Sequence, residues 1–209
     1  MITSPLSSHN TFDSHKEKAL HIDLTIDEEK ELHHKKKKEK KKAAQTEWAF
    51  RKPEINDGNQ VNSLIESCPP LDTNSAYCNF LQTSHFSETC VLAERNGEIA
   101  GFVSAYLKPS KDDIKRPVLF IWQVAVAENS RGSGLAYRMI KSLLNRKLLT
   151  DVAAIETTIT KDNQGSWNLF RKVERELGEK GRVSVFLDKE NHFDGEHDSE
   201  YLFHIPLAK

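Results

Sequence analysis

The chain has 209 residues, 37% hydrophobic and 29% charged, and its 30 basic and 31 acidic side chains leave a formal net charge of −1. This total excludes a uniformly basic nucleic-acid binder and a uniformly acidic, solvated chain. No apolar run approaches the ~20 residues that cross a bilayer, and the N-terminus lacks the pattern of a secretory signal. Three cysteines are too few for a disulfide framework, so we expect a cytoplasmic protein without a membrane span.

The beginning of the chain is polar and rich in lysine. Between His33 and Lys42 it holds seven lysines and one glutamate. Such a block repels itself and has nothing to bury, so residues 1–45 are predicted to be a disordered tail and residues 46–209 a folded domain. Contact with nucleic acid or anionic lipid is the alternative. The block has no arginine or aromatic side chain for recognition, so nucleic acid is not an expected partner.

The first predicted elements are a strand from Thr46 to Phe50 and two short helices. The first helix has Asp57 as a candidate N-cap and ends before Pro69-Pro70. Its apolar face consists of Val61, Leu64 and Ile65. The second helix follows residues 71–74, and its side chains at helical spacing are Tyr77, Phe80 and Leu81.

Strands are predicted next, because the apolar residues now alternate or form short runs. Residues 90–93 and 99–106 form a predicted hairpin through Asn96-Gly97, a dipeptide that suits a type I′ turn. Residues 118–126 are too continuously apolar for an edge strand and are predicted at the centre of the sheet. The apolar face of the following helix consists of Leu135, Met139, Ile140, Leu143 and Leu144.

The last predicted elements are a strand at 153–160, a helix from 165 or 166 to 177, and strands at 183–187 and 201–205. This order predicts an α/β fold of the mixed α+β kind, in which one central mixed β-sheet is flanked by helices. An exposed strand edge near residues 183–205 is a candidate surface for a homodimer.

One segment, residues 123–136, combines a central strand, a short loop and the start of a helix. Gly132 and Gly134 remove β-carbons where a ligand approaches the backbone, and the helix start offers unpaired N–H groups. Together they form an anion site suited to a pyrophosphate. The spacing matches neither the dinucleotide fingerprint nor a P-loop. For the glycines alone, a turn without a ligand is an equal alternative.

Arg131-x-x-Gly134-x-Ala136 after a buried strand resembles the acetyl-CoA motif of the GCN5-related N-acetyltransferases, the GNAT superfamily. The resemblance covers about residues 46–206 and implies the GNAT acyl-CoA N-acyltransferase fold, with acetyl-CoA as co-substrate. It implies that Val124 and Val126 pair with the pantetheine arm. The backbone groups that would hold the pyrophosphate are those of Arg131, Gly132, Ser133, Gly134, Leu135 and Ala136.

Asn163 and the helix that starts at Ser166 resemble the second cofactor motif of that superfamily. One position departs from the pattern. Phe170 stands where many members have a tyrosine that protonates the departing thiolate, so the resemblance leaves that role open.

Six separated segments together resemble the diaminobutyrate acetyltransferases, a GNAT family that acetylates the 4-amino group of L-2,4-diaminobutyrate on the route to the osmolyte ectoine. The segments are residues 70–78, 85–90, 101–106, 122–126, 156–158 and 197–203. We expect direct attack of the neutral amine on acetyl-CoA, which requires no catalytic cysteine. The loop from Ser110 to Pro117 looks like a local insertion.

A cationic diamine needs carboxylates, and Asp72 and Glu200 are the expected ammonium ligands. An ordinary helix cap is the alternative for Asp72. Tyr77 is expected to hydrogen-bond the substrate or to pack in the core. Trp122 is expected to bind an ammonium through its indole face or to pack in the core.

His197 lies three residues before Glu200, so both side chains are expected to reach one pocket. Read with His192 as metal ligands, they lack further partners, and no metal is expected. Glu156 is a candidate general base acting through water, and a sheet-face residue is the alternative.

Two competing functions stay open. The first is a GNAT enzyme that acetylates another small diamine, a polyamine or a protein amine. The second is a nucleic-acid-tethered or scaffolding protein in which the lysine block acts and the fold only binds acyl-CoA.

Overall fold

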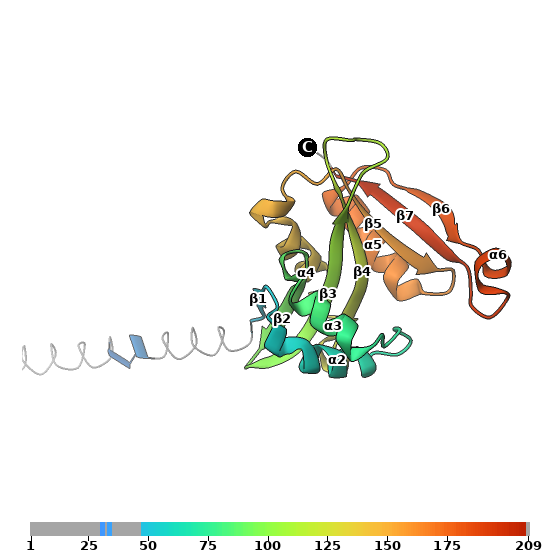
Figure 1. The fold of residues 1–209 in the computed structure, drawn as a ribbon. Helices are drawn as coiled ribbons and strands as arrows, with labels where there is room; N and C mark the ends of the chain where they lie inside the picture. Colours follow the sequence, from blue (N-terminus) through green and yellow to red (C-terminus); the bar gives the residue numbers. More distant parts are fainter. Residues whose placement is uncertain (1–29, 32, 35–46, 208–209) are drawn as a thin grey trace, which may run out of the picture. The chain divides into compact units, whose positions relative to one another are not determined.

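A computed structural model of the chain describes residues 30–31, 33–34 and 47–207 (Figure 1). The chain divides into two units, Met1–Glu47 and Trp48–Lys209. In the first unit residues 30, 31, 33 and 34 are helical and exposed, and the rest of the predicted tail, residues 1–45, lies outside the described residues. The disorder of the tail and its boundary at residue 45 therefore stay predictions. Within the described ranges, no helix has both the length and the apolar character to span a bilayer.

The second unit is built on a mixed sheet that has seven strands among the described residues, in the order β1-β2-β3-β4-β5-β7-β6. Neighbouring strands are antiparallel except β4 and β5, which run parallel. The strands are β1 (Ala49–Arg51), β2 (Val91–Arg95), β3 (Glu98–Lys108), β4 (Val118–Val126), β5 (Ala154–Thr160), β6 (Arg182–Leu187) and β7 (Glu200–Pro206). The predicted central position of residues 118–126 is confirmed.

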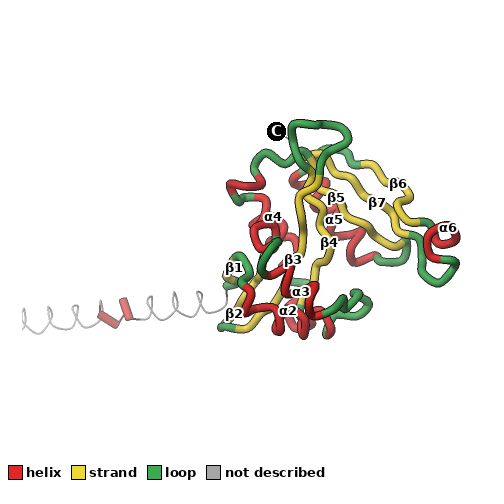
Figure 2. Tube along the Cα trace, viewed as in Figure 1, coloured by secondary structure: helices red, strands yellow, loops and turns green. Residues whose placement is uncertain are grey.

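Helices cover both faces of this sheet (Figure 2). They are α2 (Gly58–Glu66), α3 (Ala76–Thr83), α4 (Leu135–Leu144), α5 (Gln164–Leu177) and the short α6 (Lys189–Phe193). Single 3₁₀ turns lie at Ile55–Asp57, Ser87–Thr89, Glu128–Ser130 and Lys147–Leu149. Apart from α6 and these turns, the predicted order of elements is confirmed.

Alternation along the strands divides the core into two layers. In β2, Val91 and Ala93 pack in the layer with α4 and α5, whereas Leu92 between them packs in the layer with α2. β3 repeats the pattern with Val103 and Phe102. Successive side chains of a strand point to opposite faces of the sheet. Because helices cover both faces, both sets of side chains are buried, which explains why the apolar runs of these strands are continuous.

The hairpin turn between β2 and β3 has the predicted form. Asn96 and Gly97 have φ values of 56° and 82°, and both central residues of a type I′ turn need positive φ. Asp57 is the N-cap of α2 as predicted, but its side chain makes no cap hydrogen bond. Arg51 donates to both carboxylate oxygens of Asp57 at 2.7 Å, and this hydrogen bonding lowers the pKa of Asp57.

The inner face of α3 differs from the predicted one. Tyr77 is 72% exposed, and the buried residues of α3 are Asn79, Gln82 and Thr83. The side-chain amide of Asn79 donates to the amide oxygen of Asn62 on α2 at 2.8 Å. Because polar side chains also join α3 to α2, apolar spacing did not identify the buried face, and the core alternative for Tyr77 is wrong.

Candidate active site

The central sheet opens between β4 and β5. These parallel strands pair only at their first residues, with Val118, Leu119 and Phe120 opposite Ala154, Ile155 and Glu156. Beyond Phe120 the strand β4 continues beside β3 alone. Its edge towards β5 therefore presents backbone groups that no strand uses, and a ligand with amide groups can pair with them.

A β-bulge lies on β4 at this opening. Gln123 pairs with Ser104 and Ile121 pairs with Ala105, so Trp122 is the extra residue of the bulge. The backbone N–H of Gln123 donates to the hydroxyl of Ser104 at 3.2 Å. A bulge redirects side chains, and here it leaves Trp122 44% exposed in a strand whose other residues are buried or half-buried.

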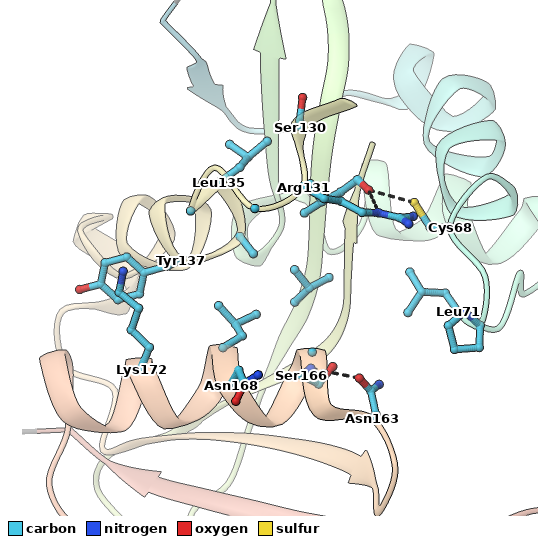
Figure 3. Close-up of a pocket in the computed structure, with 18 of the residues that line it drawn as sticks. Cys68, Leu71, Ser130, Arg131, Leu135, Tyr137, Asn163, Ser166, Asn168 and Lys172 are labelled. Carbon is cyan, nitrogen blue, oxygen red and sulfur yellow. Dashed lines mark hydrogen bonds between the residues drawn. The ribbon is translucent and has the colours of Figure 1, made fainter. Parts of the chain in front are cut away.

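A cleft of about 560 Å³ lies at the end of β4. The loop after β4, the start of α4, one face of α5 and the segment after α2 form its walls (Figure 3). Of the predicted cofactor residues, those that line this cleft are Val124, Val126, Arg131, Gly132, Gly134, Leu135, Ala136 and Asn163. Ser133 does not line it, because its hydroxyl turns back and donates to the carbonyl of Ser130 at 2.5 Å.

The glycines of the loop have the backbone that the anion site requires. Gly132 and Gly134 have φ values of 73° and 78°, and a β-carbon at either would meet no other atom within 4 Å. Gly134 is the N-cap of α4, so the free N–H groups of that helix begin where the cleft is open. The chain therefore fits the pyrophosphate of an acyl-CoA, which helix N-termini bind through N–H groups and the helix dipole.

Val124 and Val126 both line the cleft, as the resemblance implies. The carbonyl of Val126 accepts hydrogen bonds from Nε of Arg131 at 3.1 Å and from Sγ of Cys68 at 3.4 Å (Figure 3). Backbone groups of a strand alternate in direction, so the peptide groups of Val124 and Val126 face the same side. Because the carbonyl of Val126 already accepts two hydrogen bonds, the backbone groups of Val124 are the more available ones to pair with the pantetheine arm of acetyl-CoA.

A second cavity of about 760 Å³ adjoins the cleft, since Pro70, Leu71 and Asn163 line both. Its other lining residues are Asp72, Phe86, Tyr106, Phe120, Trp122, Gln123, Thr158, Ile159, Thr160, Phe186 and Glu200. Three of the predicted substrate ligands thus line one cavity although they lie far apart in the sequence. They are Asp72, Trp122 and Glu200.

The loop that carries Asp72 is tied to the bulge. Gln123 donates from its side-chain amide to the backbone carbonyl of Asp72 at 2.6 Å and accepts from the amide of Asn74 at 3.1 Å. The backbone N–H of Asn74 donates to Oδ1 of Asp72 at 3.1 Å. Asn74 has a φ of 54°, a left-handed conformation that asparagine tolerates. Gln123 itself is 7% exposed, so this contact is shielded from water.

Aromatic rings form much of the second cavity. Tyr106 lies edge-on to Trp122 with ring centroids 6.4 Å apart and contacts Phe120 at 5.1 Å. Phe86 and Phe186 line the same cavity and are about half exposed. Carboxylates beside aromatic faces favour an ammonium group, which both can stabilise.

Tyr77 and His197 line neither cavity. Tyr77 is exposed on α3, and the ring of His197 contacts Phe193 at 5.4 Å beyond the end of α6. The expected convergence of His197 with Glu200 is therefore not seen in this chain. The roles of Tyr77 and His197 in binding substrate stay predictions.

Glu156 also lies outside both cavities. Its carboxylate accepts from Nδ1 of His204 at 2.7 Å and pairs with Nζ of Lys108 at 2.5 Å. Burial of this carboxylate favours its neutral form, but the hydrogen bonds from Lys108 and His204 outweigh burial and lower its pKa. This placement does not support the general-base role, which stays untested.

Several lining residues were not singled out from the sequence. Ser130, Tyr137 and Lys172 line the cleft, and the ammonium of Lys172 lies 4.4 Å from the ring centroid of Tyr137 at the end away from Asn163 (Figure 3). The aromatic residues of the second cavity come from the strands β3, β4 and β6 and from the turn at Phe86. A partial signal existed, because Phe120 and Trp122 are two apart on one strand. Among the described residues, no group of three potential ligands could hold a metal ion.

Comparison with known proteins identifies the family and the fold. Residues 59–174 match the model of the acetyltransferase (GNAT) family. The L-2,4-diaminobutyric acid acetyltransferase of Vibrio parahaemolyticus is 57% identical over 160 residues, which are 77% of this chain and 86% of that protein. The enzyme of that name from Methylotuvimicrobium alcaliphilum is 47% identical over 154 residues, covering 74% of this chain and 87% of its own.

A solved structure is similar over the same region. It is the diaminobutyrate acetyltransferase EctA of Paenibacillus lautus in complex with its substrate L-2,4-diaminobutyric acid and coenzyme A. The two chains are 39% identical with a TM-score of 0.69, and the match covers 78% of this chain and 96% of that one. That relative, which has the same fold, thus binds L-2,4-diaminobutyric acid and coenzyme A.

Proposed function

The chain is a member of the acetyltransferase (GNAT) family, and we propose that it moves the acetyl group of acetyl-CoA to the 4-amino group of L-2,4-diaminobutyrate. The products are N4-acetyl-L-2,4-diaminobutyrate and CoA. This acetylated diamine is the precursor from which ectoine is formed, and ectoine biosynthesis is the pathway that we propose for the enzyme.

The observation that carries this function is the junction of the two cavities. The cleft provides the glycine loop and the open edge of β4 for acetyl-CoA, and the second cavity brings Asp72 and Glu200 together with aromatic rings. At neutral pH the substrate carries two ammonium groups and one carboxylate. Two carboxylates in a partly apolar cavity suit a substrate with two ammonium groups better than a monoamine.

The attacking nitrogen must be neutral, whereas an alkylammonium in water has a pKa of about 10. Asp72 follows directly after Pro70 and Leu71, which border the cleft, so its carboxylate is suited to hold the ammonium that will react. Loss of the proton to water then leaves an amine beside the thioester. The increase in reaction rate comes chiefly from holding the amine and the thioester together in one orientation.

Backbone N–H groups of β4, at the opening between β4 and β5, would stabilise the negative charge that develops on the thioester oxygen. No cysteine nucleophile is required. Burial raises the pKa of the Cys90 thiol to about 12, and Cys68 donates its S–H to the Val126 carbonyl. Phe170 is buried and carries no proton to donate, so the thiolate receives its proton from another group or from water.

Initial rates of CoA release with a panel of amines test this function. The panel consists of L-2,4-diaminobutyrate, L-ornithine, L-lysine and spermidine. We expect kcat/KM to be at least tenfold higher for L-2,4-diaminobutyrate than for the others. Equal or better values for a polyamine would favour the alternative, a GNAT enzyme for another small diamine, polyamine or protein amine.

We also propose a homodimer through the β6 edge. β6 is the last strand of the sheet, and its exposed apolar side chains are Val183 (41%), Val185 (57%) and Phe186 (47%). An exposed apolar strand edge favours pairing with another chain. Light scattering of the wild type and of Val185→Lys tests this, with a dimer and a monomer as the expected results. We also propose that the enzyme is located in the cytoplasm, as expected from the sequence.

A further inference from the structure

The second cavity contains no cationic side chain among its described lining residues. The substrate proposed above nevertheless has a carboxylate, and the cavity already holds the negative groups Asp72 and Glu200. Lys108, whose ammonium lies 5.4 Å from the ring centroid of the lining residue Phe120, pairs with Glu156 outside the cavity. A carboxylate entering this cavity must therefore be bound by neutral donors.

Two such donors stand on β5. Thr158 and Thr160 are two residues apart and both line the cavity, as expected for side chains on one face of a strand. Both are half-buried. In the described structure neither hydroxyl has a hydrogen-bond partner, whereas the Thr89 hydroxyl donates to the carbonyl of Ala105. The two Thr hydroxyls are thus free to donate into the cavity.

Strand register puts an acid beside these hydroxyls. Thr160 lies directly opposite Glu200 in the antiparallel pair of β5 and β7, and Thr158 lies opposite Leu202. Directly opposite residues have β-carbons roughly 5 Å apart. A carboxylate acceptor and hydroxyl donors at that spacing match the ammonium and carboxylate that share the α-carbon of an amino acid.

We propose that Thr158 and Thr160 bind the substrate carboxylate while Glu200 binds the α-ammonium, so that this wall of the cavity selects an α-amino-acid diamine over a plain diamine. The other amino group then extends towards Asp72 and the cleft. This inference rests on the proposed function and assigns the end of the substrate that does not react. Thr158 and Thr160 are specificity residues in this assignment.

Two substrates separate carboxylate recognition from amine recognition. L-2,4-diaminobutyrate and 1,3-diaminopropane have the same spacing between nitrogens, but only the first has a carboxylate. Wild-type enzyme should show kcat/KM at least about tenfold higher for L-2,4-diaminobutyrate, since a hydrogen bond to a charged group contributes roughly 1.5–3 kcal/mol. If wild-type enzyme acetylates both amines equally well, the carboxylate is not recognised and the inference is overturned.

Variants then test the two hydroxyls. Thr158→Val and Thr160→Val keep the side-chain shape, and each should lower kcat/KM about tenfold for L-2,4-diaminobutyrate but less than threefold for 1,3-diaminopropane. Thr158→Ser and Thr160→Ser keep the hydroxyl and should retain the preference even if the valine variants fold poorly. Thr157→Val is the matched control, because Thr157 lies on the same strand but lines neither cavity.

Equal losses on both amines in folded valine variants, or loss of preference in the serine variants, would contradict the assignment. The proposed function fails differently, namely when wild-type enzyme does not acetylate L-2,4-diaminobutyrate at all.

Discussion

The side-chain amide of Gln123 donates a hydrogen bond of 2.6 Å to the backbone carbonyl of Asp72, which joins the bulge of β4 to the loop before α3. The same amide accepts from Asn74. One buried side chain thus fixes the distance between the cofactor strand and a carboxylate of the substrate cavity.

Gln123→Met should raise the KM for L-2,4-diaminobutyrate about tenfold, because loss of two hydrogen bonds frees the Asp72 loop, each bond being worth about 1 kcal/mol. The KM for acetyl-CoA should change less than threefold. Steady-state kinetics with each substrate varied in turn measures both. Gln82→Met, which changes a buried amide outside both cavities, is the matched control and should leave both constants unchanged. Equal increases in the two KM values would instead indicate general damage to the fold.

Asp72→Asn and Glu200→Gln each remove a negative charge from the substrate cavity with little change in shape. Each should raise the KM for the diamine roughly 10- to 100-fold, as expected when a charge-assisted hydrogen bond worth about 1.5–3 kcal/mol is lost. The KM for acetyl-CoA should stay within threefold of the wild-type value. Glu196→Gln, an exposed acid outside the cavity, serves as control. Parallel effects on both substrates would assign the two acids to structure and not to ammonium binding.

Gly134→Ala tests the anion site at the start of α4. An alanine at φ 78° costs about 1 kcal/mol of stability, and its methyl group would occupy the open space before the helix N-terminus. We expect the KM for acetyl-CoA to rise about tenfold, since the N–H groups of the helix would be obstructed. Gly97→Ala is the control, because Gly97 has φ 82° in an equally open turn and does not line the cleft. If both variants have the same KM for acetyl-CoA, the loop does not bind the cofactor.

Glu156→Gln distinguishes an ion-pair role from a general base. Lys108 and His204 would lose the buried anion they share, so the free energy of unfolding at pH 7 should fall by roughly 3 kcal/mol, while kcat changes less than threefold. The pKa of Glu156 is lowered in the folded protein, so its stabilisation is complete above the ordinary value of 4.5 and is lost as pH falls through the folded pKa. Urea unfolding of wild type and variant at pH 7 and pH 3.5 should show a smaller difference at the lower pH. If turnover by a folded variant instead fell by about 100-fold or more, the general-base interpretation would be restored.

Local patterns predicted most of this fold. The run at 118–126, the Asn96-Gly97 turn and the apolar face of α4 are each encoded by neighbouring residues, and all three are confirmed. α6 has one apolar residue in five and no periodicity, so it was missed. The buried polar face of α3 was missed because its partner Asn62 lies on another helix.

The candidate site divides in the same way. The glycine loop is contiguous in sequence, and its predicted residues line the cleft with the exception of Ser133. The environment of Glu156 depends on the register of four strands, β3, β4, β5 and β7, which brings Lys108 and His204 to it, and no local pattern encodes that register. Strand pairing likewise decides that Thr160 stands opposite Glu200.

The position of the acetyl group on the product tests the central claim most directly. Purified full-length protein is incubated with acetyl-CoA and L-2,4-diaminobutyrate, and the product is examined by two-dimensional proton–carbon NMR. The account predicts that the acetyl group is on the 4-amino nitrogen, with the α-ammonium unmodified. Acetylation of the 2-amino nitrogen, or of both nitrogens equally, would contradict it.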